Sequence, residues 1–252
     1  MYKFQHIAKF YDLFSQGLTK DIKFYLEEAK KCKGKVLEVA VGTGRIFLPM
    51  LKNKVDAYGF DISDGMLEML KQKAKKQKID VTGRLSKQDM RTFKYNQKFD
   101  LITIPYRAFL HNSNPEEQLA TLKQCYKYLN KNGRLIINFY LPNPASLAKK
   151  LKKNFKEEDS TVKRKNYSVR LIGFVTQDYL KQQLHITYYF HEKMKGKPIE
   201  VYKDEFTMTW IGLNEFKNLA ARANFKIDKL YGDFKRNPVK NVKTELIWVL
   251  KK

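Results

Sequence analysis

The fold class that the sequence predicts is α/β, with a mostly parallel sheet at its centre. Strand-length apolar segments alternate with helical segments from Lys20 to Tyr140, and this alternation is typical of βαβ units. After Leu141 the chain changes to segments in which apolar and polar residues alternate, which indicates antiparallel strands. We therefore expect one parallel sheet that carries an inserted antiparallel β meander.

The elements of the first part follow from hydrophobic periodicity and helix-end signals. Helices are predicted at 20–31, 45–52, 64–77 and 115–129, and strands at 35–41, 56–61, 81–85, 99–104 and 134–140. Ser63 is the expected N-cap of the third helix, because a serine hydroxyl accepts a hydrogen bond from a first-turn N–H group. Asn132-Gly133 is the expected C-terminal stop of the fourth helix.

The second part mixes helical and antiparallel patterns. A lysine-rich helix is predicted at 145–154, followed by strands at 168–176, 183–192 and 199–210, a helix at 214–223, and strands at 226–231 and 244–250. The segment Lys195-Gly196-Lys197-Pro198 is typical of a turn between two of these strands. We expect the first three strands to form a substrate lid over the carboxyl edge of the parallel sheet.

The composition argues against a membrane span and a metal site. No apolar run approaches the roughly eighteen residues that a span needs. The four histidines and the two cysteines, Cys32 and Cys125, lack the spacing of zinc ligands, so separate free thiols in a reducing compartment are expected. The segment from Met1 to His6 lacks the pattern of a secretory signal, and a cytoplasmic location is the default expectation.

The net charge of +24 is the main oddity of the composition. It would suit a partner that carries phosphates or carboxylates. The excess is mainly lysine, whereas arginine is the usual choice for bidentate contacts to such groups. Lysine clusters at 71–78 and 149–156 lie where helices present a solvated face. An anionic partner and an ordinary solvated surface therefore both remain open.

A glycine turn follows the first predicted strand. Gly42-Thr43-Gly44 stands between an apolar strand and a helix, and only glycine lets the backbone approach a ligand closely there. Asp61 ends the second strand 19 residues after Gly42, where a carboxylate can accept hydrogen bonds from ribose hydroxyls. Phe47 occupies the place of the third glycine of a dinucleotide fingerprint, which argues against NAD or FAD.

A second acidic residue follows the third strand. Asp89 stands beside Met90, and this pair could bind an adenine amine and cover the face of its ring. An ordinary loop acid and a core methionine are the alternative interpretation.

These motifs together resemble class I S-adenosylmethionine-dependent methyltransferases, over about residues 8–141 and 213–250. The family's first motif is matched by Glu38-Val39-Ala40-Val41-Gly42-Thr43-Gly44, with Ala40 where many members have glycine. The resemblance implies a Rossmann-like three-layer sandwich with a seven-stranded sheet that ends in an antiparallel hairpin. It also implies S-adenosyl-L-methionine as cofactor and S-adenosyl-L-homocysteine as product.

The resemblance also implies a set of site residues and a division of the chain. The expected cofactor contacts are Tyr11, Glu38, Ala40, Gly42, Thr43, Gly44, Asp61, Ile62, Met66, Asp89 and Met90. Residues 1–144 would form the cofactor-binding core with an N-terminal lid helix, residues 145–212 the substrate lid, and residues 213–252 the return to the core.

The acceptor is expected at the carboxyl ends of the fourth and fifth strands. Tyr106, Arg107 and His111 follow the fourth strand and are the candidate catalytic residues. His111 could act as a general base and Arg107 could hold a carboxylate or phosphate, although a helix cap and a surface charge are the alternatives. Tyr140 and the meander aromatics Tyr188, Tyr189 and Trp210 could point to the same crevice.

Three hypotheses follow for the function. The leading one is methyl transfer to nitrogen or oxygen of a small metabolite, with anionic metabolites included because of the charge. The second makes RNA or another nucleic acid the acceptor. The third is a regulatory protein that binds the cofactor without turnover. The sequence does not predict the oligomeric state.

Overall fold

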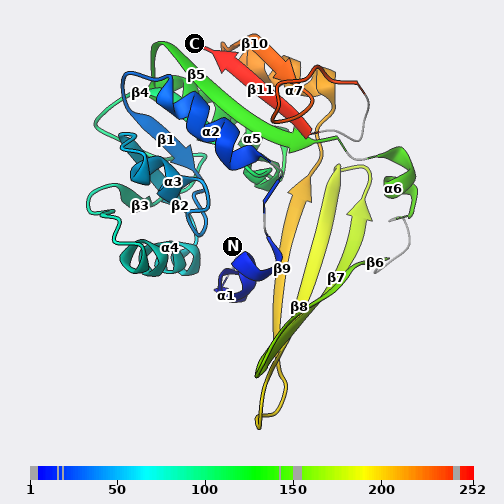
Figure 1. Cartoon of the computed structure of the whole chain (residues 1–252). Coiled ribbons are helices and arrows are strands. Elements are labelled where there is room, and N and C mark those ends of the chain that lie inside the picture. The colour runs from blue at the N-terminus through cyan, green and yellow to red at the C-terminus, as the bar shows by residue number, and fades with distance from the viewer. Residues whose placement is uncertain (1–4, 16, 19, 142, 150–154, 241–244) are drawn as a thin grey trace.

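The protein is described by a computed structural model that covers residues 5–15, 17–18, 20–141, 143–149, 155–240 and 245–252. Figure 1 shows two bodies of secondary structure: a sheet covered by helices, and a second sheet that projects away from it. The lysine cluster at 149–156 lies partly outside the described residues. Residue 244, where the last strand was predicted to begin, lies outside them as well.

The central layer is a seven-stranded sheet with the order β10-β11-β5-β4-β1-β2-β3. Its strands are β1 (Val36–Val39), β2 (Ala57–Asp61), β3 (Leu85–Lys87), β4 (Phe99–Ile104), β5 (Leu129–Tyr140), β10 (Lys226–Tyr231) and β11 (Glu245–Lys251). The pairs from β3 to β5 are parallel, whereas β11 pairs antiparallel with both β5 and β10. The predicted parallel sheet with its terminal hairpin is confirmed.

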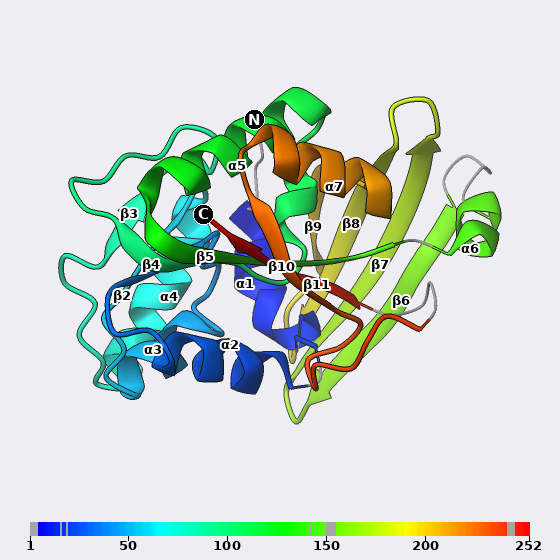
Figure 2. The same ribbon diagram turned by 90° about the horizontal axis from the view of Figure 1, so that it is seen from above.

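Helices cover both faces of this sheet (Figure 2). They are α2 (Asp21–Lys30), α3 (Phe47–Lys52), α4 (Asp64–Lys76), α5 (Pro115–Tyr128) and α7 (Leu213–Arg222). Phe24 of α2, Phe47 of α3 and Leu67 of α4 share one buried cluster. Leu122 of α5 and Phe216 of α7 belong to the cluster on the other face. The result is the expected three-layer sandwich.

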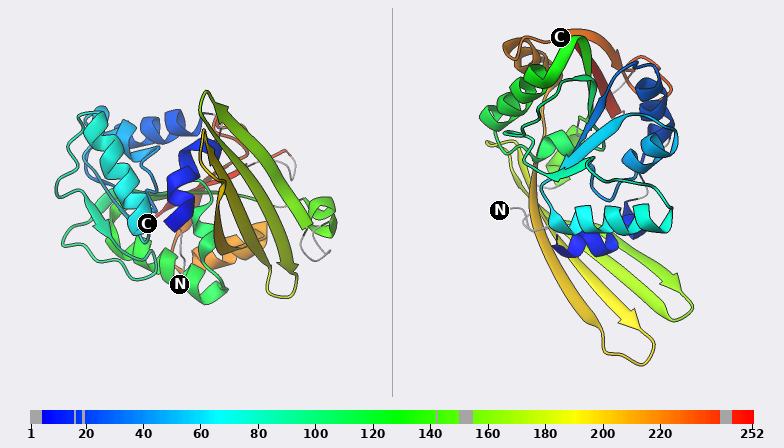
Figure 3. Two further views of the ribbon diagram at one scale, coloured as in Figure 1. Left: turned by 90° about the horizontal axis from the view of Figure 1, so that it is seen from below. Right: turned by 90° about the vertical axis from the view of Figure 1, so that its left-hand side faces the viewer.

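The second sheet has four antiparallel strands in chain order. They are β6 (Phe155–Arg164), β7 (Tyr167–Asp178), β8 (Gln183–Met194) and β9 (Glu200–Thr209), preceded by the short helix α6 (Pro144–Lys149). Helix α1 (Gln5–Phe14) contacts both α4 and β9, and Figure 3 shows it between the two bodies. The predicted meander is confirmed, although it has one strand more than expected.

Several predicted boundaries hold in detail. Strand β4 spans the predicted residues, and Ser63 is the N-cap of α4, with its Oγ accepting from the Met66 N–H at 3.3 Å. Gly196 lies in the predicted β8–β9 turn with a φ of 76°. Positive φ values favour glycine, which has no Cβ to clash with the backbone.

Other predicted boundaries are wrong. The third strand begins only at Leu85, because the preceding residues form a turn in which Gly83 has a φ of 68°. Helix α5 ends at Tyr128, and Asn132 lies inside β5 with a φ of 66°, so Asn132-Gly133 is not a helix stop. The helix predicted at 145–154 is described only to Lys149, and residues 150–154 lie outside the described part.

None of the helices in the described part of the chain combines the length and apolar composition that crossing a membrane requires. The described residues also contain no group of three or more His, Cys, Asp or Glu side chains placed to hold a metal ion. The domain boundaries at 144/145 and 212/213 stay predictions.

Candidate functional site

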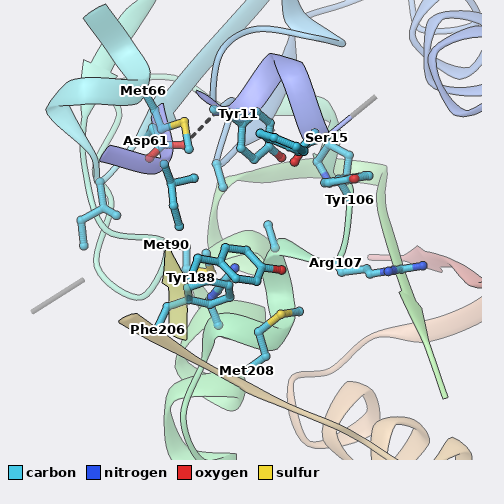
Figure 4. Close-up of a pocket in the computed structure, with 18 of the residues that line it drawn as sticks. Tyr11, Ser15, Asp61, Met66, Met90, Tyr106, Arg107, Tyr188, Phe206 and Met208 are labelled. Atoms are coloured by element: carbon cyan, nitrogen blue, oxygen red, sulfur yellow. Dashed lines mark hydrogen bonds between the residues drawn. The ribbon is translucent and has the colours of Figure 1, made fainter. Parts of the chain in front are cut away.

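A pocket of about 490 Å³ lies where the two bodies meet. Its walls come from α1, from the segments after β1, β2, β3 and β4, and from the inner face of the four-stranded sheet. Figure 4 shows Asp61 and Met66 on one side of it and Tyr188, Phe206 and Met208 on the other. The carboxyl edge of the parallel sheet therefore faces the second sheet across one continuous cavity.

The glycine turn enters the pocket through Gly42. Ala40, Gly42 and Gly44 have φ values of 56°, 54° and 80°. A Cβ added to Gly42 would have no heavy atom within 4 Å, so the backbone there faces open space. A Cβ added to Gly44 would lie 2.8 Å from Leu70 Cγ, so that glycine permits helix packing instead. Ala40 and Gly42 line the pocket and Gly44 does not.

Asp61 is held at the floor of the pocket by the chain on both sides. Its Oδ2 accepts from the Gly42 N–H at 2.8 Å and its Oδ1 from the Ser63 N–H at 2.9 Å. Burial raises the pKa of this carboxyl above its ordinary value, although the backbone hydrogen bonds act in the opposite direction. A carboxylate has about four acceptor positions, so Asp61 can accept further hydrogen bonds from a ligand.

Glu38 lies directly behind the turn but does not line the pocket. Its side chain is buried, and its Oε2 has no hydrogen-bond partner among the described residues. Burial raises the pKa of this carboxyl well above its ordinary value, whereas Arg45 lowers it. A buried polar atom without a partner is costly and is rare in native structures.

Thr43 holds helix α1 over the pocket by a hydrogen bond. Its Oγ1 donates to Asp12 Oδ1 at 2.7 Å, and Lys73 Nζ donates to Asp12 Oδ2 at 2.8 Å. Tyr11, one residue earlier in α1, lines the pocket. Thr43 itself is buried and does not line it, so its role in this structure is to position the helix.

The segments after β2 and β3 form the side wall. Ile62, Met66, Asp89 and Met90 all line the pocket, and Ile62 is 40% exposed. Arg91 Nε donates to Asp89 Oδ1 at 2.9 Å. Burial raises the pKa of Asp89, but its hydrogen bonds with Arg91 outweigh burial and leave the pKa below its ordinary value. These four predicted cofactor contacts thus lie together.

The segment after β4 is strained and is held by a residue that the sequence analysis missed. Tyr106 and Arg107 have φ values of 52° and 65°, which cost free energy for residues with a side chain. Asn138, fully buried in β5, accepts from the Tyr106 N–H at 2.8 Å and from the Tyr25 hydroxyl at 2.7 Å. The available signal was a single amide within the apolar run of β5.

Arg107 is engaged on the far side of this segment. Its Nε donates to Glu245 Oε1 at 2.8 Å, and its guanidinium lies 4.4 Å from the ring centroid of Tyr140. The Tyr106 ring lies 6.4 Å from the Tyr11 ring in an edge-on arrangement. Tyr106 and Arg107 both line the pocket.

His111 lines the pocket from the 3₁₀ helix Ala108–His111 (η1). Its Nδ1 lies 3.3 Å from the carbonyl oxygen of Thr207. A carbonyl only accepts, so in the neutral ring Nδ1 carries the proton and Nε2 is the basic nitrogen. Burial lowers the pKa of His111 to about 4, against the hydrogen bond with Thr207, which raises it. The ring is therefore neutral near pH 7.

The four-stranded sheet supplies the opposite wall. Tyr188, predicted to point into the crevice, does so together with Phe206, whose ring lies 5.3 Å away. Glu158 from β6 also lines the pocket; it was missed because β6 was not predicted. Trp210 packs in a separate apolar cluster, and Tyr189 stacks edge-on with Phe174.

Comparison with known proteins agrees with this geometry. Residues 36–133 match the family described as a methyltransferase domain. The matched segment contains the glycine turn, Asp61, Asp89 and the strained segment after β4.

Solved structures share the fold of the whole chain around that segment. An S-adenosylmethionine-dependent methyltransferase from Clostridium acetobutylicum ATCC 824 is 17% identical, with 96% of this chain and 97% of that chain covered and a TM-score of 0.77. CcbJ from Streptomyces caelestis is 18% identical (98% and 96% covered, TM-score 0.76). DesVI from Streptomyces venezuelae is 19% identical (96% and 97% covered, TM-score 0.73). These likenesses establish the class I methyltransferase fold.

Two curated relatives each match about half of this chain. YqeM of Bacillus subtilis (strain 168), named provisionally as a methyltransferase, is 24% identical over 54% of this chain and 55% of its own length. A provisionally named methyltransferase of Geobacillus sp. (strain WCH70) is 25% identical over 52% of this chain and 51% of its own length. The chain thus spans about half the length of the curated relatives it matches.

Proposed function

We propose that this protein transfers a methyl group from S-adenosylmethionine to a nitrogen or oxygen atom of a small molecule. The observation that carries the proposal is the continuous pocket in which Gly42 and Asp61 face the aromatic wall of the second sheet. One end has the groups that a nucleoside requires, and the other end has room and side chains for an acceptor.

The residues of the first end fit S-adenosylmethionine. Gly42 leaves open space beside its backbone, so a ligand can approach the turn closely. Asp61, fixed by two backbone N–H groups, accepts hydrogen bonds from the ribose hydroxyls. Met66 and Met90 pack against the adenine ring, and Asp89 accepts from its amine. Tyr11 and the rest of α1 exclude water from the site.

The chemistry asks little of the protein beyond alignment. When bound, S-adenosylmethionine supplies an activated methyl group on a sulfonium. The protein orients the acceptor in line with that group and removes its proton where it has one. His111 is the candidate base, because it is neutral near pH 7 and its Nδ1–H is committed to Thr207.

Proteins of similar structure support a small acceptor. CalS10 from Micromonospora echinaspora, an amino pentose methyltransferase, has a TM-score of 0.69 with 96% of this chain covered. KedS8 from Streptoalloteichus sp. ATCC 53650, a sugar N-methyltransferase, has a TM-score of 0.72 with 95% covered. Their identities of 16% and 15% support the fold, and their acceptors illustrate what such a pocket can hold.

Two alternatives are weaker. NAD is disfavoured because Phe47 is fully buried at the start of α3. Its ring lies so close to Gly59 that a side chain at that position would contact it. A nucleic-acid acceptor is suggested only by the net charge of +24. The two arginines that line the pocket, Arg91 and Arg107, are both bound to carboxylates of this chain.

Titration calorimetry with S-adenosylmethionine, S-adenosylhomocysteine and NAD tests the proposal. We expect both sulfur ligands to bind and NAD not to bind. Gly42→Ala places a methyl group in the open space and should weaken binding of both sulfur ligands by about tenfold or more.

Gly83→Ala is the matched control, because Gly83 also has a positive φ and open space but does not line the pocket. It should bind both ligands as the wild type does. Failure of the wild type to bind either sulfur ligand would refute the proposed function.

A further inference from the structure

The wall formed by the four-stranded sheet narrows the acceptor to one chemical class. We propose that the acceptor is a protonated amine and that Glu158 binds its ammonium group. The proposal rests on the proposed function for the methyl donor, whereas the acceptor is argued from the side chains of β6, β8 and β9.

Glu158 and Tyr188 are brought together by a glycine between them. The cross-strand register places Glu158 of β6 opposite Gly173 of β7, and Gly173 opposite Tyr188 of β8. A Cβ at Gly173 would lie 2.8 Å from Tyr188 Cε1 and 2.9 Å from Glu158 Cβ. The Tyr188 ring and Glu158 therefore flank Gly173 on the same face of the sheet. A glycine within a strand often marks such a close approach.

The charges of the pocket favour a cation at this end. Among the described residues, the carboxylate of Glu158 has no hydrogen-bond or ion-pair partner, and Glu158 lines the pocket. By contrast, Arg91 is bound to Asp89, and Arg107 is bound to Glu245. An anionic acceptor would find both guanidinium groups engaged and would be repelled by Glu158. An ammonium group would pair with Glu158.

The aromatic side chains beside Glu158 fit the same ligand. Tyr188 and Phe206 stand edge-on at 5.3 Å, and the His111 ring lies 5.7 Å from Phe206. Aromatic faces attract ammonium groups, and the attraction strengthens when water is excluded. Burial, together with the carboxylates of Glu157 and Glu158, raises the pKa of Tyr188 to about 12, so its hydroxyl stays neutral.

An amine acceptor must lose one proton before it reacts. The ammonium gives this proton to water, which leaves a lone pair on the nitrogen. That lone pair forms the new N–CH₃ bond as the S–CH₃ bond breaks, and the bonding electrons stay on sulfur. The products are the methylated ammonium, S-adenosylhomocysteine and the proton released to water.

The test compares ligands of one shape and three charges: cyclohexylamine, cyclohexanol and cyclohexanecarboxylate. Each is titrated into protein saturated with S-adenosylhomocysteine and, separately, into protein without it. We expect wild-type protein to bind the amine about tenfold more tightly than the alcohol, since one charged hydrogen bond contributes that much. The carboxylate should bind more weakly than either.

Two variants test whether Glu158 causes the preference for the amine over the alcohol. Glu158→Gln should bind amine and alcohol equally, with an unchanged melting temperature because Glu158 has no partner among the described residues to lose. Glu205→Gln removes the same charge from an exposed position on β9 outside the pocket and should keep the preference of the wild type.

The proposal is overturned if no amine binds, if the carboxylate binds best, or if Glu158→Gln keeps the preference for the amine. Failure of the proposed function is separate from these results. It would appear as loss of S-adenosylhomocysteine binding, while the titrations without that ligand would still report on Glu158.

Discussion

The two walls of the pocket are built by different means. The wall at the edge of the parallel sheet consists of backbone turns and of carboxylates that the backbone itself holds, such as Asp61 with the Gly42 N–H. The opposite wall consists of side chains that meet only through the register of the four-stranded sheet, such as Glu158 and Tyr188 across Gly173. Substitutions in the first wall should therefore disturb the fold, and those in the second should change ligand preference.

The largest effect is expected from Gly44→Ala, in the turn directly behind the first wall. The new Cβ would lie 2.8 Å from Leu70 Cγ and 3.0 Å from Leu48 Cγ, at a φ of 80°. Left-handed strain and overpacking together should lower the free energy of unfolding by about 3 kcal/mol. Urea denaturation measures this loss, and Gly83→Ala, which adds strain without a clash, should lose only about 1 kcal/mol.

Asn138→Leu should have the next largest effect. It removes the acceptor of both the Tyr106 N–H and the Tyr25 hydroxyl, and leaves these donors buried. We expect a loss of about 2 kcal/mol in urea denaturation. Tyr25→Phe removes only one of the two hydrogen bonds and should lose about 1 kcal/mol. Equal losses in the two variants would mean that Asn138 does not hold the strained segment.

The stability of the protein should depend on pH through His111. This residue connects both walls, because it follows β4 and contacts Thr207 of β9. Its pKa falls to about 4 on folding, so the unfolded chain binds more protons between about pH 6.5 and 4. Stability is therefore full above about pH 6.5 and falls as the pH is lowered to 4. The loss should be on the order of 1 kcal/mol, as the ring is partly exposed.

Thermal unfolding at pH 7.5 and pH 5 measures this dependence. His111→Gln should show a smaller change of melting temperature between the two pH values than the wild type does. The same change in both proteins would assign the dependence to other groups.

Gly173→Ala, a substitution in the second wall, should have the smallest effect on binding. Its Cβ would push against the Tyr188 ring and weaken binding of cyclohexylamine about threefold, a cost below 1 kcal/mol. Binding of S-adenosylhomocysteine should not change. A parallel loss of both affinities in calorimetry would show that the two walls are not independent.

The first wall could be predicted from the sequence because its residues are linked by local spacing. The strand, the Gly42-Thr43-Gly44 turn and Asp61 belong to one βαβ unit, whose geometry is nearly fixed. The same reasoning did not distinguish Gly42, which faces the pocket, from Gly44, which faces Leu70, because both look alike in sequence.

The second wall could not be predicted because it depends on contacts between distant strands. Strand β6 has polar residues on both faces, so it lacks the alternation that reveals a strand, and Glu158 and Ser160 were missed with it. Asn138 was missed for a similar reason, since its partners Tyr25 and Tyr106 come from other elements. Such contacts appear only once the register is known.

The position of β11 in the seven-stranded sheet makes the folding of one body depend on the folding of the other. It pairs with β5 from Glu245 opposite Tyr140 onward, although the whole four-stranded sheet lies between them in the chain. Closing that loop in a disordered chain has an entropy cost that grows with the logarithm of its length. The hairpins of the four-stranded sheet join strands adjacent in sequence and can form before the loop closes. Their formation shortens the loop, so the body that carries Glu158 lowers the entropy cost of completing the sheet that carries Asp61.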